Sequence, residues 1–136
     1  MKYLLTLMLI MSMLSSCKKS GASADPKSID NTMLQGEWVL AETESANGGI
    51  NKPLNKETIT FKLPNHYHTS RNDIALEEGE YSFSTGIVYG GKTKNIIIFS
   101  SQPYVHTSDV IEISNDTLYM SDFLTYNAQT SIYTRR

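Results

Sequence analysis

Apolar and polar residues alternate along several short segments of this 136-residue chain. Successive side chains of a β-strand point to opposite faces of the sheet, so this alternation predicts strands with one buried face each. The alternating residues are Trp38 and Leu40; Ile59, Phe61 and Leu63; Tyr81 and Phe83; Ile111 and Ile113; Leu118 and Met120; and Tyr133 and Arg135. No long helical pattern and no internal repeat is visible. We therefore expect an all-β domain.

Turn signals separate the alternating segments, among them Pro64-Asn65, Gly90-Gly91 and Ser114-Asn115-Asp116. They define eight predicted strands, at 36–43, 57–63, 66–70, 79–89, 95–100, 109–114, 117–121 and 129–135. We treat 79–89 as one strand that bends at Gly86, where a glycine bulge would fit. Splitting this segment would give nine strands and mix long loops with short turns.

Eight alternating strands predict a small antiparallel up-and-down β-barrel, because closure leaves no exposed edge strand. Successive connections then alternate between the two ends, and the longer ones all fall at one end. Those long loops are 44–56, 71–78, 101–108 and 122–128. Before the first strand, Asp30 or Thr32 can cap a helical turn over Met33 and Leu34, which Gly36 ends. This turn would plug the end with the short connections.

The first 16 residues differ in composition from the rest. Lys2 precedes an apolar run from Tyr3 to Leu14, which is shorter than the ~20 residues of a transmembrane helix and predicts a cleaved signal peptide. The run Leu14-Ser15-Ser16-Cys17 resembles the lipobox of bacterial lipoproteins. That resemblance implies that Cys17 becomes the lipidated N-terminus, with several acyl chains, palmitate included, as a durable anchor. The alternative is an ordinary secretory signal and a buried free thiol.

A polar stretch rich in small residues follows Cys17 and predicts a flexible tether. Lys18, not an aspartate, comes directly after Cys17, which by resemblance to lipoprotein sorting rules implies delivery to the outer membrane. The tether lacks an acidic cluster, so we expect the domain to face the periplasm. The expected organisation is a signal peptide at 1–16, a tether at 17–28 and one domain at 29–136.

The charge balance and the single cysteine argue against nucleic-acid binding and against a cysteine-based disulfide or metal site. Lys2 is the only charged residue of the leader, so the mature part carries 11 basic and 14 acidic side chains. This balance argues against nucleic acid as a partner, because Lys and Arg contacts to phosphate supply most of that affinity. A single cysteine excludes an internal disulfide and a Cys-rich metal site.

Gly36-Glu37-Trp38 opens the first predicted strand, after a helical turn, and a basic residue ends the last strand. Together these features resemble the lipocalin-like barrels of the calycin group, small lipoprotein versions included, over residues 29–136. The resemblance implies that Trp38 packs at the barrel floor with Arg135 over its face, a structural cation–π contact of roughly 0.5 to 2 kcal/mol. The chain is shorter than classical lipocalins and lacks their Thr-Asp-Tyr type motif.

An eight-stranded interior can either hold one small ligand or be filled by side chains. A ligand would enter at the long-loop end, where Tyr104 and His106 on one loop meet Phe123 and Tyr126 on another. These are the candidate binding residues for a small hydrophobic or glycan-like molecule. The alternative is that they only hold the loops, while large inward residues fill the barrel. Those inward residues are Trp38, Phe61, Tyr67, Tyr81, Phe83 and Tyr133.

No residue pattern points to catalysis, a cofactor or a metal. His66 and His68 share the solvent side of a predicted strand, but no carboxylate spacing completes a metal site. Glu77, Glu78 and Glu80 fit a solvated edge better than an acid/base pair. We therefore expect a non-enzymatic, membrane-anchored lipoprotein that binds a small ligand. The alternative is a structural or interaction lipoprotein whose filled barrel binds another envelope protein.

Overall fold

The computed structural model describes residues 26–101, 105–123, 125 and 128–136, and for 105 and 106 the backbone alone. A short helix, α2 (Asn31–Leu34), leads into the strands. The strands are β1 (Gly36–Glu44), β2 (Ile50–Asn51), β3 (Glu57–Lys62), β4 (His66–Arg71), β5 (Ile74–Ile87), β6 (Thr93–Ser101), β7 (Val105–Ser114), β8 (Thr117–Asp122) and β9 (Thr130–Arg135). No helix in the described part of the chain is long and apolar enough to cross a membrane.

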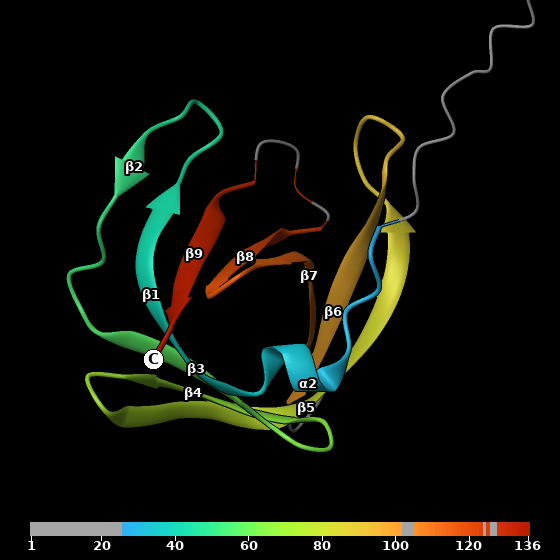
Figure 1. Ribbon diagram of the computed structural model, residues 1–136. Helices are drawn as coiled ribbons and strands as arrows, with labels where there is room; N and C mark the ends of the chain where they lie inside the picture. The colour runs from blue at the N-terminus through green and yellow to red at the C-terminus, as the bar shows by residue number, and fades with distance from the viewer. Residues whose placement is uncertain (1–25, 102–104, 124, 126–127) are drawn as a thin grey trace, which may run out of the picture.

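Eight of these strands close into an antiparallel up-and-down barrel, as predicted (Figure 1). Neighbours in sequence pair with each other from β3 to β9, and β1 pairs with both β3 and β9, which completes the ring. The two-residue strand β2 is extra and pairs only with the end of β1. We call the end that carries α2 and the connections 63–65, 88–92 and 115–116 the closed end. The other is the open end.

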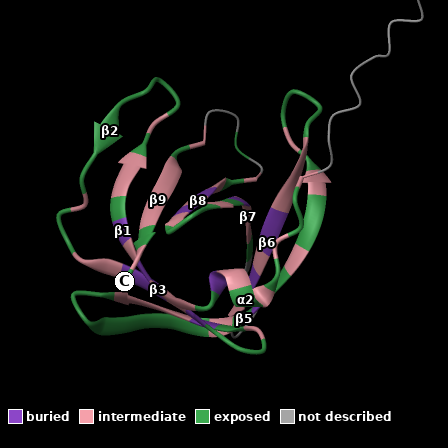
Figure 2. Ribbon diagram, in the orientation of Figure 1, coloured by how far each residue is buried: buried purple, intermediate pink, exposed green. Residues whose placement is uncertain are grey.

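The core is one cluster of buried residues to which seven of the eight barrel strands contribute, while β9 adds the partly buried Tyr133. Because side chains alternate along each strand, every second residue points inward. Figure 2 shows these buried positions scattered along the strands and on α2, with exposed positions on the projecting hairpins. The buried members are Leu34, Trp38, Ile59, Phe61, Tyr67, Tyr81, Ile97, Phe99, Ile111, Leu118 and Met120. All six large residues predicted to face inward belong to this cluster or pack against it.

Helix α2 plugs the closed end. Asp30 caps it by accepting hydrogen bonds from the backbone N–H groups of Thr32 and Met33. Leu34 is fully buried, and its carbonyl oxygen accepts a hydrogen bond of 2.7 Å from the indole Nε1 of Trp38. The first turn of the domain is thus joined to the floor of the barrel.

The predicted long loop at 71–78 is wrong. Strand β5 begins at Ile74, and a tight turn at Asn72 and Asp73, which have φ angles of 51° and 64°, joins it to β4. Residues 74–78 pair with β4 only, whereas β6 joins from Gly79 onward. This part of the hairpin therefore extends past the barrel with both faces in water, and even its apolar residues Ile74 and Leu76 are exposed.

Two further details differ from the expectation. The predicted loop at 101–108 is mostly strand, because β6 runs to Ser101 and β7 starts at Val105. Gly86 forms no bulge, since β5 and β6 stay in register from Gly79 to Ile87. The shifts in register lie elsewhere, at Ala41 in β1 and at Leu76 in β5. Neither position carries the glycine that guided the prediction.

Candidate functional site

The structure places two of the four predicted ligand-binding residues. Tyr104 and Tyr126 lie outside the described residues, as does Cys17. The backbone of His106 lies within β7, opposite Ser100, and not in a loop. Phe123 directly follows β8, and its backbone N–H donates a hydrogen bond of 3.2 Å to the carbonyl oxygen of Ser108.

Phe123 lies on the outer face of the barrel. A Cβ atom added at Gly86 would come within 3.1 Å of the Phe123 ring and would also meet the side chain of Ile96. Gly86 is three residues from Phe83, which packs against the core, and so faces the other side of β5. The phenyl ring therefore covers the outside of the sheet, where Ile96 is also buried, and does not line the interior.

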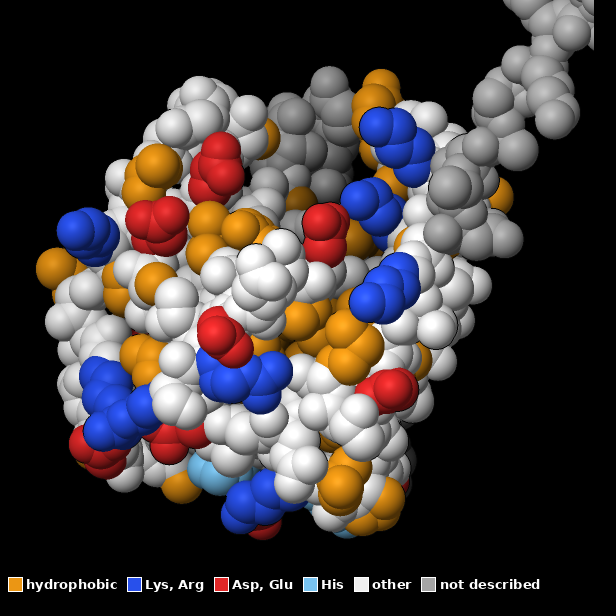
Figure 3. All heavy atoms as spheres, viewed as in Figure 1, with side chains coloured by type: hydrophobic (Ala, Val, Ile, Leu, Met, Phe, Trp, Pro, Cys, Tyr) orange, Lys and Arg blue, Asp and Glu red, His pale blue; other side chains and the backbone are white. Residues whose placement is uncertain are grey.

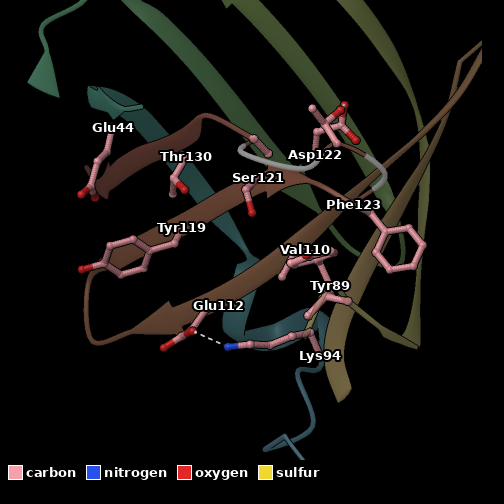
Figure 4. A pocket seen from close by; sticks show the side chains of 13 residues that line it. Glu44, Tyr89, Lys94, Val110, Glu112, Tyr119, Ser121, Asp122, Phe123 and Thr130 are labelled. Carbon is pink, nitrogen blue, oxygen red and sulfur yellow. Dashed lines mark hydrogen bonds and ion pairs between the residues drawn. The ribbon is translucent and has the colours of Figure 1, made fainter. Parts of the chain in front are cut away.

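A groove with a volume of about 560 Å³ lies on this outer face. Apart from Asp122, its lining residues on β7 and β8 alternate with core residues, so they project outward (Figure 4). The tip of the β5–β6 hairpin forms one border of the groove. Its lining comprises Glu44, Val88, Tyr89, Lys94, Val110, Glu112, Tyr119, Ser121, Asp122, Phe123, Thr125, Ala128 and Thr130.

Aromatic and charged side chains share the groove. Tyr119 lies in it beside Glu112, and the carboxylate of Glu112 forms an ion pair of 3.5 Å with the ammonium group of Lys94. Glu44 enters from β1. Such a combination of tyrosine, phenylalanine and rim charge is typical of protein interfaces.

The open end of the interior is polar and acidic. Asp109 pairs directly with Asp122, and each lies two residues from a core residue, Ile111 in β7 and Met120 in β8, so both backbone positions face inward. Burial, and next the nearby charge of Asp122, raise the pKa of Asp109. Tyr67 donates a hydrogen bond of 2.8 Å to Glu77. The described part of this end therefore differs from the apolar mouth that a hydrophobic ligand would need.

Three tyrosines of the interior have raised pKa values. Burial, followed by the hydrogen bond to Glu77, raises the pKa of Tyr67 to about 12. Burial, followed by the charges of Glu57 and Asp109, raises the pKa of Tyr133 to about 12. Burial alone raises the pKa of Tyr81, whose buried hydroxyl has no hydrogen-bond partner within the described part of the chain. All three therefore remain protonated at neutral pH.

Among the described residues, no group of three or more His, Cys, Asp or Glu side chains is arranged to hold a metal ion. His66 is exposed and His68 is half-buried. Both lie on the face of β4 opposite the core residue Tyr67, which is the solvent side predicted from the sequence. In the pairing of β4 with β5, His66 lies opposite Glu80 and His68 opposite Glu78.

Reasoning from the sequence missed the outer groove. Alternation marks Glu112 and Tyr119 as outward residues, but it does not show that several strands and a hairpin together enclose a hollow there. Comparison of the chain with known protein families, with curated proteins and with solved structures finds no match.

Proposed function

We propose that this protein is a lipid-anchored lipoprotein of the bacterial outer membrane that faces the periplasm. Its lipocalin-like barrel serves as a rigid, non-enzymatic binding module for another envelope protein. The observation that carries the proposal is the position of the hollow: the middle of the barrel is filled by its own side chains, and the groove lies outside.

Aromatic rings from four strands fill the middle of the barrel. The rings of Phe61 and Tyr81 meet edge to face with centroids 5.1 Å apart, and those of Tyr67 and Phe99 do so at 4.7 Å. Phe61 and Phe99 also stack at 6.3 Å. A hydrophobic ligand at this level would have to displace these contacts, each of which contributes about 0.5 to 1.5 kcal/mol beyond burial. The filled core thus favours the interaction lipoprotein over a carrier of small hydrophobic molecules.

The groove offers what a protein partner needs. Tyr119 supplies a large aromatic surface of the kind that dominates binding energy at interfaces. Glu44 and Glu112 lie beside it with Lys94, so the charge of these three residues is net negative. A partner segment with an apolar residue flanked by a basic one would complement this surface.

Lipocalin-like character is supported by the closed end. Arg135 lies over Trp38, 4.2 Å from the ring centroid, which is the contact that the resemblance implied. The helical turn before β1 and the closed eight-stranded barrel fit the same group of folds.

The interaction is tested by site-specific photo-crosslinking of the full-length protein in its own envelope. A photoreactive residue at Tyr119 should crosslink one reproducible protein, and Glu112→Arg should abolish this product. Ser82 is the matched control, because it is exposed on the outside of β5 beyond the groove lining. Equal crosslinking from Ser82, or none from Tyr119, would refute the groove as the binding surface.

The anchor is tested separately. Mass spectrometry of the N-terminal peptide should show an acylated Cys17, and Cys17→Ser should release the protein from the membrane fraction. An unmodified Cys17 in membrane-bound protein would remove the basis for calling it a lipoprotein.

A small polar, glycan-like ligand at the open end is the second candidate. The inward positions of Asp109 and Asp122 favour it. So does the buried hydroxyl of Tyr81 in the interior, which has no hydrogen-bond partner among the described residues, since such groups usually find one. Native mass spectrometry of protein purified without denaturation should then show an added mass, lost on Asp109→Leu and kept on Asp116→Leu. A bare protein mass in every preparation would eliminate this candidate.

A further inference from the structure

The tip of the β5–β6 hairpin exposes two large apolar side chains. Ile87 is 71% exposed and Tyr89 is 82% exposed. Gly90 and Gly91, with φ angles of 91° and 75°, shape the turn between them and β6. Single exposed apolar residues are ordinary, but a pair at the tip of a projecting hairpin marks a contact surface.

Two exposed lysines lie on this hairpin or on the segment bound to it. Lys92 is exposed in the turn, and Lys27 is exposed where the described chain begins. The side-chain amide of Asn95 donates a hydrogen bond of 2.8 Å to the carbonyl oxygen of Lys27, which holds that segment against β6. Figure 3 shows Lys or Arg and hydrophobic side chains together in this region. Lys94 is nearby but already forms its ion pair with Glu112.

The same hairpin lies close to the membrane if Cys17 is acylated. Only the eight residues 18–25 separate Cys17 from the described chain, and an extended chain spans at most ~3.3 to 3.6 Å per residue. Lys27 comes ten residues after Cys17, so it is held within about 33 to 36 Å of the lipid. Because connections alternate between the barrel ends, the hairpin shares the closed end with α2, near this point of attachment.

We propose that the tip of the β5–β6 hairpin docks on the lipid bilayer that carries the anchor, with Ile87 and Tyr89 at the level of the headgroups and Lys27 and Lys92 on anionic lipids. Tyrosine favours the membrane interface because its ring is apolar and its hydroxyl stays hydrated, and each lysine near an anionic surface adds attraction. The inference rests on the lipid anchor of the proposed function. It fixes the domain with its closed end toward the membrane.

Quenching of tryptophan fluorescence by brominated lipid tests the docking. The acylated full-length protein is reconstituted in vesicles of phosphatidylethanolamine and phosphatidylglycerol with brominated chains. Trp38 is fully buried and supplies a constant background. Tyr89→Trp should be strongly quenched, and Lys27→Glu together with Lys92→Glu should reduce that quenching by about twofold or more.

Leu54→Trp is the matched control. Leu54 is 101% exposed, more than Tyr89, and lies in the connection at the opposite end of the barrel. If exposure alone decided which residue enters the lipid, Leu54→Trp would be quenched at least as strongly as Tyr89→Trp. Equal quenching at the two positions, stronger quenching at 54, or quenching at neither would overturn the docking.

The acylation state of Cys17, measured by mass spectrometry on the same sample, separates the two proposals. An acylated protein without quenching at position 89 refutes the docking and leaves the anchor intact. An unacylated Cys17 refutes the anchor, and the docking with it.

Discussion

The guanidinium group of Arg135, in the last strand β9, lies over the indole ring of Trp38, in the first strand β1. Its central carbon is 4.2 Å from the ring centroid. The same guanidinium group donates hydrogen bonds to the carbonyl oxygens of Gln35 at 2.6 Å and Met33 at 2.8 Å. One side chain therefore joins β9, β1 and the carbonyl groups that the end of α2 leaves unpaired.

Replacing Arg135 tests this junction. Arg135→Ala should lower the free energy of unfolding by about 2 to 4 kcal/mol, because it removes a cation–π contact and leaves helix-end carbonyls without a donor. Arg135→Lys should recover less than half of that loss, since an ammonium group cannot form the planar fork. Denaturation in urea measures both values. Arg136→Ala, which removes an exposed ion pair with Glu37, is the control and should change stability little.

Trp38 should be the most sensitive core position. Its side chain is fully buried, and its Nε1 donates to Leu34. Trp38→Ala should cost about 3 to 5 kcal/mol, as is typical of buried tryptophan. Trp38→Phe keeps an aromatic ring but loses the hydrogen bond, and should cost less than the alanine variant. An unchanged melting temperature for Trp38→Ala would contradict the packing of the closed end.

Asp109 should reduce stability at neutral pH. Its pKa is raised from the ordinary value of 3.8 by burial and by the charge of Asp122, so the folded state binds a proton more tightly than the unfolded state. Stability is then highest at pH values below the unfolded pKa and is lost as the pH rises through the raised folded pKa. Asp109→Asn should therefore stabilise the protein at pH 7, and the gain should disappear near pH 3.

Asp73 has a lowered pKa, so the pH dependence of its contribution to stability should have the opposite sign to that of Asp109. Lys56 lowers the pKa of Asp73 through a hydrogen bond and its charge. The stabilisation from Asp73 is thus present above the unfolded pKa and lost as the pH falls through the lowered folded pKa. Asp73→Asn should destabilise the protein slightly at pH 7. If both variants shift stability in the same direction, the assignment of the burial effect to Asp109 is wrong.

Tyr133 should contribute to unfolding in alkali. Its pKa is raised from 10.0 to about 12 by burial and by the charges of Glu57 and Asp109. Because the folded state holds this proton more tightly, the contribution is complete below pH 10 and is lost as the pH rises through 12. Tyr133→Phe should therefore reduce the loss of stability measured between pH 10 and 12.

A side chain at Gly79 should lower the stability of the fold. A Cβ atom at this position would overlap the backbone carbonyl oxygen of Ser100 and come within 3.1 Å of the Cα of Ser101. Backbone atoms of a paired strand cannot move aside, so Gly79→Ala should cost about 1 to 3 kcal/mol. At Gly86 the contacts are side chains of Ile96 and Phe123, which can shift, so Gly86→Ala should cost less. Thermal unfolding of the two variants makes the comparison.

The strand pattern was predictable wherever one face of a strand is buried. Strands β3, β8 and β9 end within a residue or two of their predicted limits, because alternation of apolar and polar residues is visible in the sequence itself. The prediction failed at residues 74–78. There β5 pairs only with β4 and both faces meet water, so neither face is buried and the apolar residues Ile74 and Leu76 are followed by two glutamates.

The candidate site was less predictable than the fold. Phe123 was expected at the mouth, yet its ring covers Gly86 and Ile96 on the outside. Local sequence cannot distinguish these positions, because the face that a residue takes just after a strand depends on the continued register with β7. The backbone hydrogen bond from Phe123 to Ser108 continues that register and places the ring outside.

Local sequence is sufficient to predict the number of barrel strands, the inward residues and the short helix that plugs the closed end, since each depends on local periodicity or on a capping residue such as Asp30. The position of the groove, in contrast, follows from the three-dimensional arrangement of the strands. The groove requires outward side chains from β1, β6, β7, β8 and β9 to meet the tip of a hairpin from residues far away in the chain. Such a surface follows from barrel curvature and from pairing between distant strands, which no local pattern encodes.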